Sequence, residues 1–472
     1  MTITRRDLLK GAAVGTATVA LGACSDGATP PGATPDAADP PLNGSPDAPQ
    51  ITPPDGVPEV LGFDLGVSAG DLAADRGVLW TKYTGMAPLV AVAWRVEGDS
   101  HVEQLGPFPA MPSPAGFVHV SIAGLMPGAR YRYTFFELAA DGVTRTGRSL
   151  IGRFRAPIAD DAIEPLTLGA ICCISNTKSP DPIQRAAEDG ELDAFLFLGD
   201  TVYCEADRLD GYREDYAGHY GRPAHIALRA ATGHYITWDD HEVTNNWNPE
   251  TLDPQQIADA KAAFFEHSAI GEIAGAPQQL WRSARWGKTL EIFVLDTRGE
   301  RRPSTKNTDH AQYISPEQLA WLKAGLSASQ AVFKVIMNSV PITNMPVLWD
   351  AGGFITGDTW EVFGSQRAEL LSYIDDNDIT GVTWISGDFH LAFISHVGTP
   401  GQPGENQREI LCGPGGPSVD NPLSWTLQAP QFSFATATHN HTKLAFDPQA
   451  RTVTVSYVNG AGEEFHNEVL TM

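Results

Sequence analysis

The chain is 472 residues long, 42% of them hydrophobic, and it carries a formal net charge of −25 at pH 7. This length and apolar content suffice for two domains with cores of their own. The negative charge argues against nucleic acid or an anionic membrane surface as a partner, because phosphates would repel the protein. It suits a protein that gathers hard cations on carboxylates, although an acidic surface that only aids solubility would carry the same charge.

Residues 1–23 have the pattern of an export signal. Residues 4–10, TRRDLLK, form a twin-arginine motif, and the mild apolar stretch GAAVGTATVALGA follows them. That stretch is shorter than the roughly 20 residues that a membrane-spanning helix needs. It leads into LGAC, which resembles the lipid-attachment motif of bacterial lipoproteins with Cys24 as the modified residue. We therefore expect export by the twin-arginine route to the periplasm, the cell surface or the medium, and we favour a lipid anchor at Cys24 over an ordinary cleaved signal peptide.

Two segments of different character follow the signal. Residues 24–58 are rich in Pro, Gly, Ala and Asp, and because they bury too little apolar surface to offset their ordering entropy they are predicted to form a disordered tether. Residues 59–157 contain short β-rich runs, among them GVLWTKY, VAVAWRV and RYRYTFFEL, between Gly, Pro and Asp turns. Within them, LMPGARYRYTF is similar to the corner of fibronectin- or immunoglobulin-like sandwiches, in which a tyrosine anchors the chain. We predict a small all-β domain that supports or positions the rest.

Residues 158–472 alternate between strand-like and helix-like stretches, which predicts an α/β domain with largely parallel central strands. The apolar strand candidates are 166–174, 194–200, 234–240, 290–296, 333–341 and 381–388. One helix is predicted over 315–329, with Ser315 as N-cap, Pro316 at the first position and Gln318 closing a capping box. The stretch 364–376 follows the same logic. In such domains the chemistry gathers just beyond the carboxyl ends of the strands.

Five of the strand candidates end in side chains that bind metals or phosphates. Aspartate is common at the turn after a strand, but five such ends together are hard to attribute to turn chemistry. The side chains are Cys173, then Asp200 and Tyr203, then Asp239, Asp240 and His241, then Asp296 and Arg298, and finally Asp388 and His390.

The residue types at these ends favour two kinds of cation. The carboxylate of Asp200 can bridge two ions through its two oxygens. A phenol such as Tyr203 has a pKa near 10, so it binds as a phenolate only to a strongly Lewis-acidic ion, typically Fe³⁺. The thiolate of Cys173 suits the same ion. The alternative for Tyr203 taken alone is a packed aromatic side chain.

The stretch TWDDHEVTNNW, residues 237–247, is the densest polar cluster of the chain. A capped turn would also be polar, but so many acidic groups at one turn repel one another unless a cation holds them. His241 is a candidate ligand or proton donor. The hard oxygen donors of the cluster are Asp239, Asp240, Glu242, Asn245 and Asn246.

Six motifs taken together resemble one family. The segments GDTVY, TWDDHEVTNN, LDTR, QLAWLKAGLSAS, VIMNSVP and SGDFH, in this order, are similar to the PhoD-like alkaline phosphatases of the metallophosphoesterase superfamily. GVSAGD and GVLWTK, within residues 66–82, resemble the N-terminal β-domain found with them. The resemblance covers residues 60–470 or so. It implies a metallophosphoesterase-like α/β sandwich core, residues 158–472, preceded by the small all-β domain.

The resemblance also implies a metal cluster of Fe³⁺ and Ca²⁺. On the matching positions, Cys173, Asp200, Tyr203 and Asp388 become ligands of the iron centre, with Asp200 as the bridging candidate. Further donors to the same cluster are Asp240, Asn245 and His390. The implied activity is that of a secreted metal-dependent hydrolase of phosphomonoesters, phosphodiesters or both, which uses a metal-activated oxygen nucleophile.

Two further residues have open roles under this resemblance. Arg298 is either a group that neutralises a phosphoryl oxygen or the partner of a salt bridge to Asp296 or a neighbour. His241 either protonates the leaving alkoxide or orients a metal ligand. The expected substrate is a small-molecule phosphoester, and we expect a monomer without a nucleic-acid role.

The neighbouring cysteines 172 and 173 depart from the family pattern, which has a serine before its metal-binding cysteine. A disulfide between neighbours would close a strained ring, and a regular strand points the two side chains to opposite sides. Read in the family's register, Cys173 is the iron thiolate and Cys172 a small buried filler.

Two alternatives to a phosphoester hydrolase remain. One is a surface lipoprotein that binds a ligand on the same fold without turnover. The other is a different surface hydrolase, such as a glycosidase with paired carboxylates, which would leave Cys173 and Tyr203 without a role.

Overall fold

The computed structural model describes residues 56–472 apart from 99, 176–180, 347–348, 350–356, 417–418 and 420. The predicted signal and Cys24 lie outside the described residues, as does most of the predicted tether. In the part of the chain that is described, no helix combines the length and the apolar character needed to cross a membrane.

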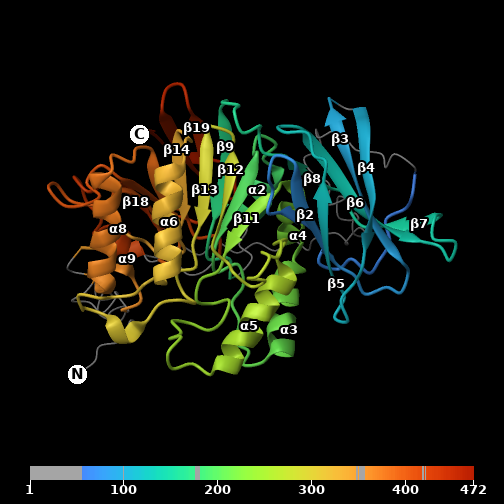
Figure 1. Ribbon diagram of the computed structural model, residues 1–472, viewed down its shortest axis with the longest axis horizontal. Helices are drawn as coiled ribbons and strands as arrows, with labels where there is room; N and C mark the ends of the chain where they lie inside the picture. The colour runs from blue at the N-terminus through green and yellow to red at the C-terminus, as the bar shows by residue number, and fades with distance from the viewer. Residues whose placement is uncertain are drawn as a thin grey trace, which may run out of the picture.

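Two large sheets form the body of the molecule (Figure 1). The first is nine-stranded, in the order β21-β20-β19-β9-β10-β11-β1-β2-β5. Its strands are β1 (Val67–Gly70), β2 (Arg76–Lys82), β5 (Phe117–Ala123), β9 (Leu166–Ile171), β10 (Ala194–Leu198), β11 (His234–Thr237), β19 (His441–Asp447), β20 (Thr452–Val458) and β21 (Glu464–Thr471). Strands β9, β10 and β11 run parallel to one another, as predicted for the central strands.

The second sheet is seven-stranded, in the order β12-β13-β14-β15-β17-β16-β18. Its strands are β12 (Arg282–Trp286), β13 (Leu290–Val294), β14 (Phe333–Met337), β15 (Val382–Ser386), β16 (Ala392–His396), β17 (Arg408–Leu411) and β18 (Phe432–Thr436). Here β13, β14 and β15 are parallel. The six apolar runs predicted as strands are therefore confirmed, and they are divided equally between the two sheets.

The apolar core lies mainly between the two sheets. The alternating side chains of strand β13 in the second sheet show this. Ile292 and Val294 of β13 join a core cluster with Leu168 of β9 and Leu196 of β10. Phe293, which lies between them in the sequence, belongs to a second cluster on the opposite face. Side chains that alternate in this way place β13 between two apolar layers, because successive residues of a strand point to opposite faces.

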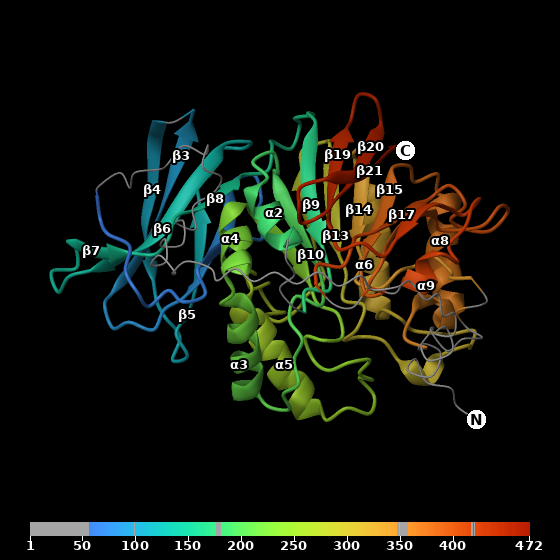
Figure 2. The same ribbon diagram turned by 180° about the vertical axis from the view of Figure 1, so that it is seen from behind.

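Helices cover the outer faces of both sheets (Figures 1 and 2). Helices α6 (Pro316–Ala328) and α8 (Gly364–Asp376) supply Leu322 and Leu370 to the outer cluster of the second sheet. On the first sheet, α2 contacts β19 and α4 contacts β1. These two helices are α2 (Pro182–Glu188) and α4 (Pro223–Ala231), whereas α3 (Leu209–Tyr220) and α5 (Pro254–His267) pack against each other and extend past the end of the sheet. Shorter turns of helix are η1 (Pro303–Thr305), η2 (Trp360–Phe363) and α9 (Asn421–Ser424).

The α6 start differs from the prediction in one detail. Ser315 is the N-cap and accepts a hydrogen bond from the Gln318 N–H, and Pro316 opens the helix, as predicted. The Gln318 side chain, however, does not close a capping box. It accepts from the Asp296 N–H and donates to the Asp296 carbonyl, while the Ser315 N–H donates to Glu300 Oε2. The Gln318 amide thereby satisfies the buried N–H and carbonyl of Asp296 in the loop after β13. Because Asp296 is not part of the helix, the helix sequence could not predict this contact. The prediction of a side-chain cap is wrong for α8, because its N-cap is Phe363, whose side chain forms no capping hydrogen bond.

The remaining five strands form a smaller sheet with the order β4-β3-β6-β7, and β8 pairs with β6. They are β3 (Leu89–Glu97), β4 (Ser100–Ala110), β6 (Arg130–Leu138), β7 (Arg145–Arg148) and β8 (Gly152–Arg155). The predicted tyrosine corner is present, because the Met126 N–H donates to the hydroxyl of Tyr131 at 2.7 Å.

The first sheet continues from the core into the predicted N-terminal domain. Strand β1 pairs in parallel with β11, with Gly70 opposite His234, and β2 and β5 extend the same sheet. Strand β1 thus covers what would otherwise be an exposed edge of the central sheet, and exposed edges invite pairing with other chains. Residues 59–157 are therefore joined to the core by sheet pairing as well as by side-chain packing.

We predict that Gly70→Ala weakens this junction. A Cβ at residue 70 would lie 2.4 Å from the carbonyl oxygen of Ala269 and 3.1 Å from that of His234, and backbone does not yield as a flexible side chain does. The free energy of unfolding should fall by about 1–3 kcal/mol, and the unfolding midpoint should fall with it. Gly190→Ala is the matched control, because nothing lies within 4 Å of a Cβ there. Equal midpoints for the two variants would contradict the tight junction.

Candidate metal centre

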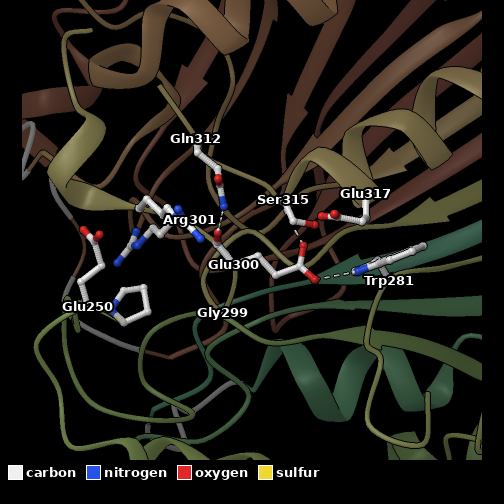
Figure 3. A pocket seen from close by; sticks show the side chains of 10 residues that line it. Glu250, Trp281, Gly299, Glu300, Arg301, Gln312, Ser315 and Glu317 are labelled. Atoms are coloured by element: carbon white, nitrogen blue, oxygen red, sulfur yellow. Dashed lines mark hydrogen bonds between the residues drawn. The ribbon is translucent and has the colours of Figure 1, made fainter. Parts of the chain in front are cut away.

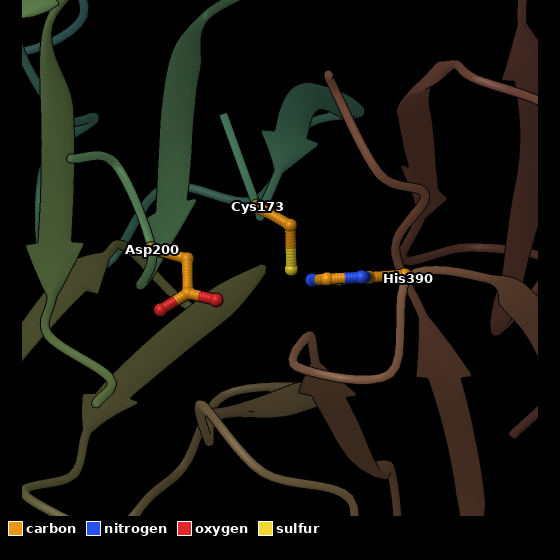
Figure 4. A group of neighbouring side chains, drawn as sticks. All are labelled: Cys173, Asp200 and His390. Carbon is orange, nitrogen blue, oxygen red and sulfur yellow. The ribbon is translucent and has the colours of Figure 1, made fainter. Parts of the chain in front are cut away.

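The carboxyl ends of the parallel strands of both sheets meet at one place, and eight of the nine predicted ligands and catalytic residues come together there, all but Asn245. Figure 4 shows one trio, Cys173, Asp200 and His390, which point toward one another from three different loops. Within each trio the candidate ligand atoms all lie within 4.8 Å of one another. The trios are Cys173–Asp200–His390, Asp200–Asp240–His241 and Asp239–Asp240–Asp388. Because Asp200 and Asp240 each belong to two trios, the three form one continuous cluster.

Four residues of the cluster have a backbone conformation that L-amino acids rarely adopt. The φ angles are +54° at Cys173, +52° at Asp200, +73° at Asp388 and +54° at His390. Such left-handed residues cost of order 1–3 kcal/mol each, and they persist where the surrounding structure enforces them. Here the enforcing contacts include the Ile174 N–H, which donates to the Asp200 carbonyl at 2.7 Å and so ties two strand ends together.

Glu242 holds the turns after β10 and β11 in place. Its buried carboxylate accepts hydrogen bonds from the N–H groups of Asp200, Thr201 and Asp239 at 2.7–3.0 Å, and from the Thr201 hydroxyl. Burial raises the pKa of Glu242 to about 7 in spite of these bonds. Glu242 was a candidate oxygen donor in the sequence, and the structure places it behind the ligands, where it fixes their backbone.

Arg298 is fully buried at the centre of the acidic groups, with 0% of its side chain exposed. Its Nε donates to Asp239, its Nη1 to Asp358 and its Nη2 to Asp388 at 3.3 Å. The Asp296 side chain is not a partner of the guanidinium; that carboxylate accepts from the Trp238 indole and from the backbone N–H groups of Arg298 and Gly299. All three nitrogen atoms of the guanidinium are therefore engaged, and the arrangement favours the salt bridge to neighbouring carboxylates over contact with a phosphoryl oxygen.

The acidic groups outnumber the cations that face them. Burial, followed by repulsion from neighbouring negative charges, raises the pKa values of Asp200 and Asp388 well above the usual range. The oxygens Asp239 Oδ2 and Asp240 Oδ1 are buried without a hydrogen-bond partner among the described residues. Unpartnered buried carboxylate oxygens are costly, and a bound cation would satisfy them. The residues present therefore fit a metal centre.

Tyr203 lies at the edge of the cluster. Its hydroxyl is 3.3 Å from both Asp200 Oδ2 and His390 Nε2, and its ring packs against that of His241 with centroids 4.0 Å apart. Burial and the negative charge of Asp200 raise the pKa of the Tyr203 phenol well above 10. A phenolate at this position therefore requires a strongly Lewis-acidic cation beside it.

The two asparagines of TWDDHEVTNNW lie differently. Both are exposed, but Asn246, in a left-handed conformation, donates its N–H to Asp240 Oδ2 at 2.6 Å. Its side-chain amide reaches Asp240 at 3.0 Å and Asp358 at 3.1 Å when Nδ2 is placed as the donor. The amide that meets the acidic cluster is thus that of Asn246, one residue beyond the predicted ligand.

Asp358 is a residue that the sequence reasoning missed. It lies just before η2, is buried and binds Arg298. A signal was present, because Asp358 follows a glycine as Asp200 and Asp388 do. It was overlooked because the residues before it do not read as a strand.

The neighbouring cysteines have different surroundings, although their thiols lie close to each other because Cys173 leaves the extended conformation of the strand. The four cysteines of the described chain are free thiols. Cys173 faces the cluster, whereas the Cys172 thiol lies 3.2 Å from the carbonyl oxygen of Cys412. Gly387 is packed so closely on Cys172 that a Cβ there would lie 2.6 Å from the Cys172 Cβ. Cys172 therefore fills a small space between the two sheets.

A cavity of ≈ 450 Å³ lies beside this cluster (Figure 3). Its wall includes Glu300, which accepts from the Trp281 indole, and Arg301, which donates to the Asp358 carbonyl. None of the predicted ligands lines it.

Two facing sheets with a buried cluster of carboxylate, thiol, phenol and imidazole groups at their strand ends define a metallophosphoesterase-like α/β sandwich. Residues 171–456 match the PhoD-like phosphatase family, residues 52–157 match the N-terminal domain of PhoD-like phosphatases, and residues 2–22 match the twin-arginine signal sequence. The chain therefore belongs to the PhoD-like phosphatase family, and the predicted export by the twin-arginine pathway is confirmed.

Three relatives illustrate the likeness. Alkaline phosphatase D of Bacillus subtilis (strain 168) is 27% identical over 390 residues, which are 71% of this chain and 65% of that protein. The match thus spans less than two thirds of that relative. A solved structure of PhoD has a TM-score of 0.71 at 22% identity and covers 87% of this chain and 89% of its own. Purple acid phosphatase PPD1 of yellow lupin (Lupinus luteus) has a TM-score of 0.63 at 12% identity over 86% of this chain and 73% of its own. Both structures share the fold.

We predict that the two cysteines differ in their effect on bound metal. Cys173→Ala removes a donor that lies within 4.8 Å of Asp200 and His390, so the metal content of the purified protein should fall. Cys172→Ser keeps a small side chain that can donate to the Cys412 carbonyl, so this variant should retain its metal. Elemental analysis of the two variants measures this directly. Equal losses would show that the thiol of Cys173 has no special place in the cluster.

We predict that Arg298→Met destabilises the fold even after chelation. Three carboxylates would lose their buried cationic partner. Removing one partner of a buried ion pair costs about 3–5 kcal/mol, because the other charge is left uncompensated. Thermal unfolding of chelator-treated protein checks this, with Arg76→Gln, whose side chain is 69% exposed, as the control. An arginine that only contacted substrate would leave the unfolding temperature unchanged.

Proposed function

We propose that this protein is an exported metal-dependent phosphoester hydrolase of the alkaline phosphatase D type, acting on phosphomonoesters, phosphodiesters or both. The observation that carries the proposal is the buried cluster in which Cys173 and Tyr203 stand beside carboxylates with unpartnered oxygens. Membership of the PhoD-like phosphatase family supports it. Neither alternative, a silent binding lipoprotein or another surface hydrolase, requires a thiol and a phenol at the same carboxylate.

The donor types support Fe³⁺ and Ca²⁺ as the bound ions. Cys173, Tyr203 and Asp200 offer the anionic sulfur and oxygen donors that suit Fe³⁺, with His390 beside them. The trio of Asp239, Asp240 and Asp388 offers only oxygens, as Ca²⁺ prefers, so we assign Asp388 to this set rather than to the iron centre at which the resemblance places it. Asp200 belongs to the first set and reaches the second through Asp240, so it is the natural bridge. We favour Asn246 over Asn245 as the amide ligand, because Asn246 is the asparagine that contacts Asp240.

The chain's own groups divide the remaining tasks. When bound, the cations polarise the phosphoryl group and promote in-line attack. His241 is half-buried at the edge of the cluster against Tyr203, a position from which it can protonate the leaving alkoxide. Arg298 holds the carboxylates in register, because its donors are taken up by Asp239, Asp358 and Asp388. We further propose that Cys24 is lipidated and that the enzyme acts as a monomer.

The test is an assay of metal-replete protein on a phosphomonoester and a phosphodiester, together with elemental analysis. We expect turnover, bound iron and a purple or brown tyrosinate-to-iron absorption band. Tyr203→Phe should lose the band, because only the phenolate oxygen gives rise to it. Tyr373→Phe, which alters a tyrosine bonded to Ser327 on the surface, should keep it. Protein without turnover and without iron would refute the proposal.

A further inference from the structure

A second polar cluster lies away from the metal centre, in a small, largely enclosed cavity between the first sheet and its helices. The cavity offers ≈ 10 Å³ to the centre of a water-sized sphere. Its polar lining comes from the end of α3, from α4, from β11 and from the end of α5. The polar lining residues are Tyr220, His225, Arg229, His234, His267 and Ser268.

Five of these side chains carry a buried atom without a partner. Each of the five residues is at least 95% buried. The atoms have no hydrogen-bond partner among the described residues, although Arg229 and His267 each form hydrogen bonds through another side-chain nitrogen. They are His225 Nε2, Arg229 Nη1, His234 Nδ1, His267 Nε2 and Ser268 Oγ.

Arg229 is the only charged group of the set, and its charge is not compensated nearby. Its Nη2 donates to neutral oxygens, the His267 carbonyl at 2.9 Å and Ser68 Oγ at 3.4 Å. The two faces of its guanidinium are covered by the rings of Trp80 and Tyr220, at 4.3 and 4.2 Å. No Asp or Glu of the described chain forms an ion pair with it, and burial lowers its pKa to about 10. A compensating charge can therefore approach only along the edge of the guanidinium, where Nη1 is.

The other polar groups supply mainly donors. His267 Nδ1 lies 2.8 Å from the Ala263 carbonyl and so carries the ring proton, which makes Nε2 its acceptor. Ser268, and one ring nitrogen each of His225 and His234, remain able to donate. Burial lowers the pKa values of the three histidines to about 3, so they are neutral and add no positive charge.

We propose that the cavity binds a single monatomic anion, with chloride as its natural occupant. An anion satisfies Arg229 Nη1 and the donors of Ser268, His225 and His234 together, and it neutralises the buried cation. One water molecule accepts only two of these four donors and leaves the charge uncompensated. The volume excludes phosphate and carboxylate ions. A metal is excluded as well, because the three imidazoles do not form a group with ligand atoms within 4.8 Å of one another.

The site has a structural role that follows from its position. Arg229 belongs to α4, Ser68 to β1 and Trp80 to β2, so the residues around the anion join the catalytic core to the N-terminal strands. The proposal does not depend on the metal centre or on phosphoester hydrolysis. A bound anion should stabilise the folded state in proportion to the logarithm of its concentration once the site is saturated.

Two measurements on the purified full-length protein test the site. Crystals grown in sodium bromide should give an anomalous difference peak at hydrogen-bond distance from Arg229 Nη1, because bromide replaces chloride and scatters anomalously. In solution, the unfolding temperature should rise with sodium chloride but not with sodium gluconate at the same ionic strength. The absence of an anomalous peak and equal unfolding temperatures in the two salts would overturn the proposal and leave water as the occupant.

Variants separate this site from general salt effects. Arg229→Gln should abolish the difference between the two salts, whereas Arg208→Gln, with a side chain 82% exposed, should preserve it. Should Arg229→Gln fail to fold, Ser268→Ala removes one donor at small cost. This variant should raise the chloride concentration for half-saturation by about tenfold, because the anion loses one hydrogen bond. A chloride response that survives unchanged in Ser268→Ala would place the anion elsewhere.

Discussion

The structure depends on the burial of more negative groups at one place than its own cations can neutralise. Asp200, Asp239, Asp240, Asp358 and Asp388 meet where the two sheets come together, and Arg298 is the guanidinium paired with three of them. Burying uncompensated charge is expensive, so a chain that does so needs either raised pKa values or bound cations. A thiol and a phenol beside the same carboxylate make cations the better solution. The cluster is thus a cost to the folded protein until metal is present, which agrees with a route of export that carries folded cargo.

The geometry of the cluster comes from the turns rather than from the strands. Four of its residues have positive φ angles, and Glu242 fixes two of the turns by accepting hydrogen bonds from three backbone N–H groups and one hydroxyl. The strands deliver each turn to the same place because the Thr237 hydroxyl at the end of β11 donates to the Leu295 carbonyl at the end of β13. A buried carboxylate that binds no metal is therefore as necessary to the ligand arrangement as the ligands are.

Much of this could be predicted from the sequence, and what could not has a common physical reason. Strand positions and the tyrosine corner follow from local patterns, because alternation and turn residues act over a few positions. The engagement of Arg298, the preference for Asn246 over Asn245 and the presence of Asp358 depend on contacts between distant segments. The Gln318 side chain shows the same limit: a local rule predicted a capping box, but the unsatisfied peptide of Asp296, 22 residues away, is its partner.

Strand β11 links the two polar clusters of the molecule. At its start, His234 lines the largely enclosed cavity and pairs with Gly70 of β1. After its end, the chain turns into Asp239 and Asp240. A four-residue strand has little rigidity of its own, so its position must come from its neighbours, β10 on one side and β1 on the other. The N-terminal strands therefore do more than cover an edge. They fix the strand that presents two carboxylates to the metal centre, which explains why a domain without catalytic residues shares a sheet with the catalytic core.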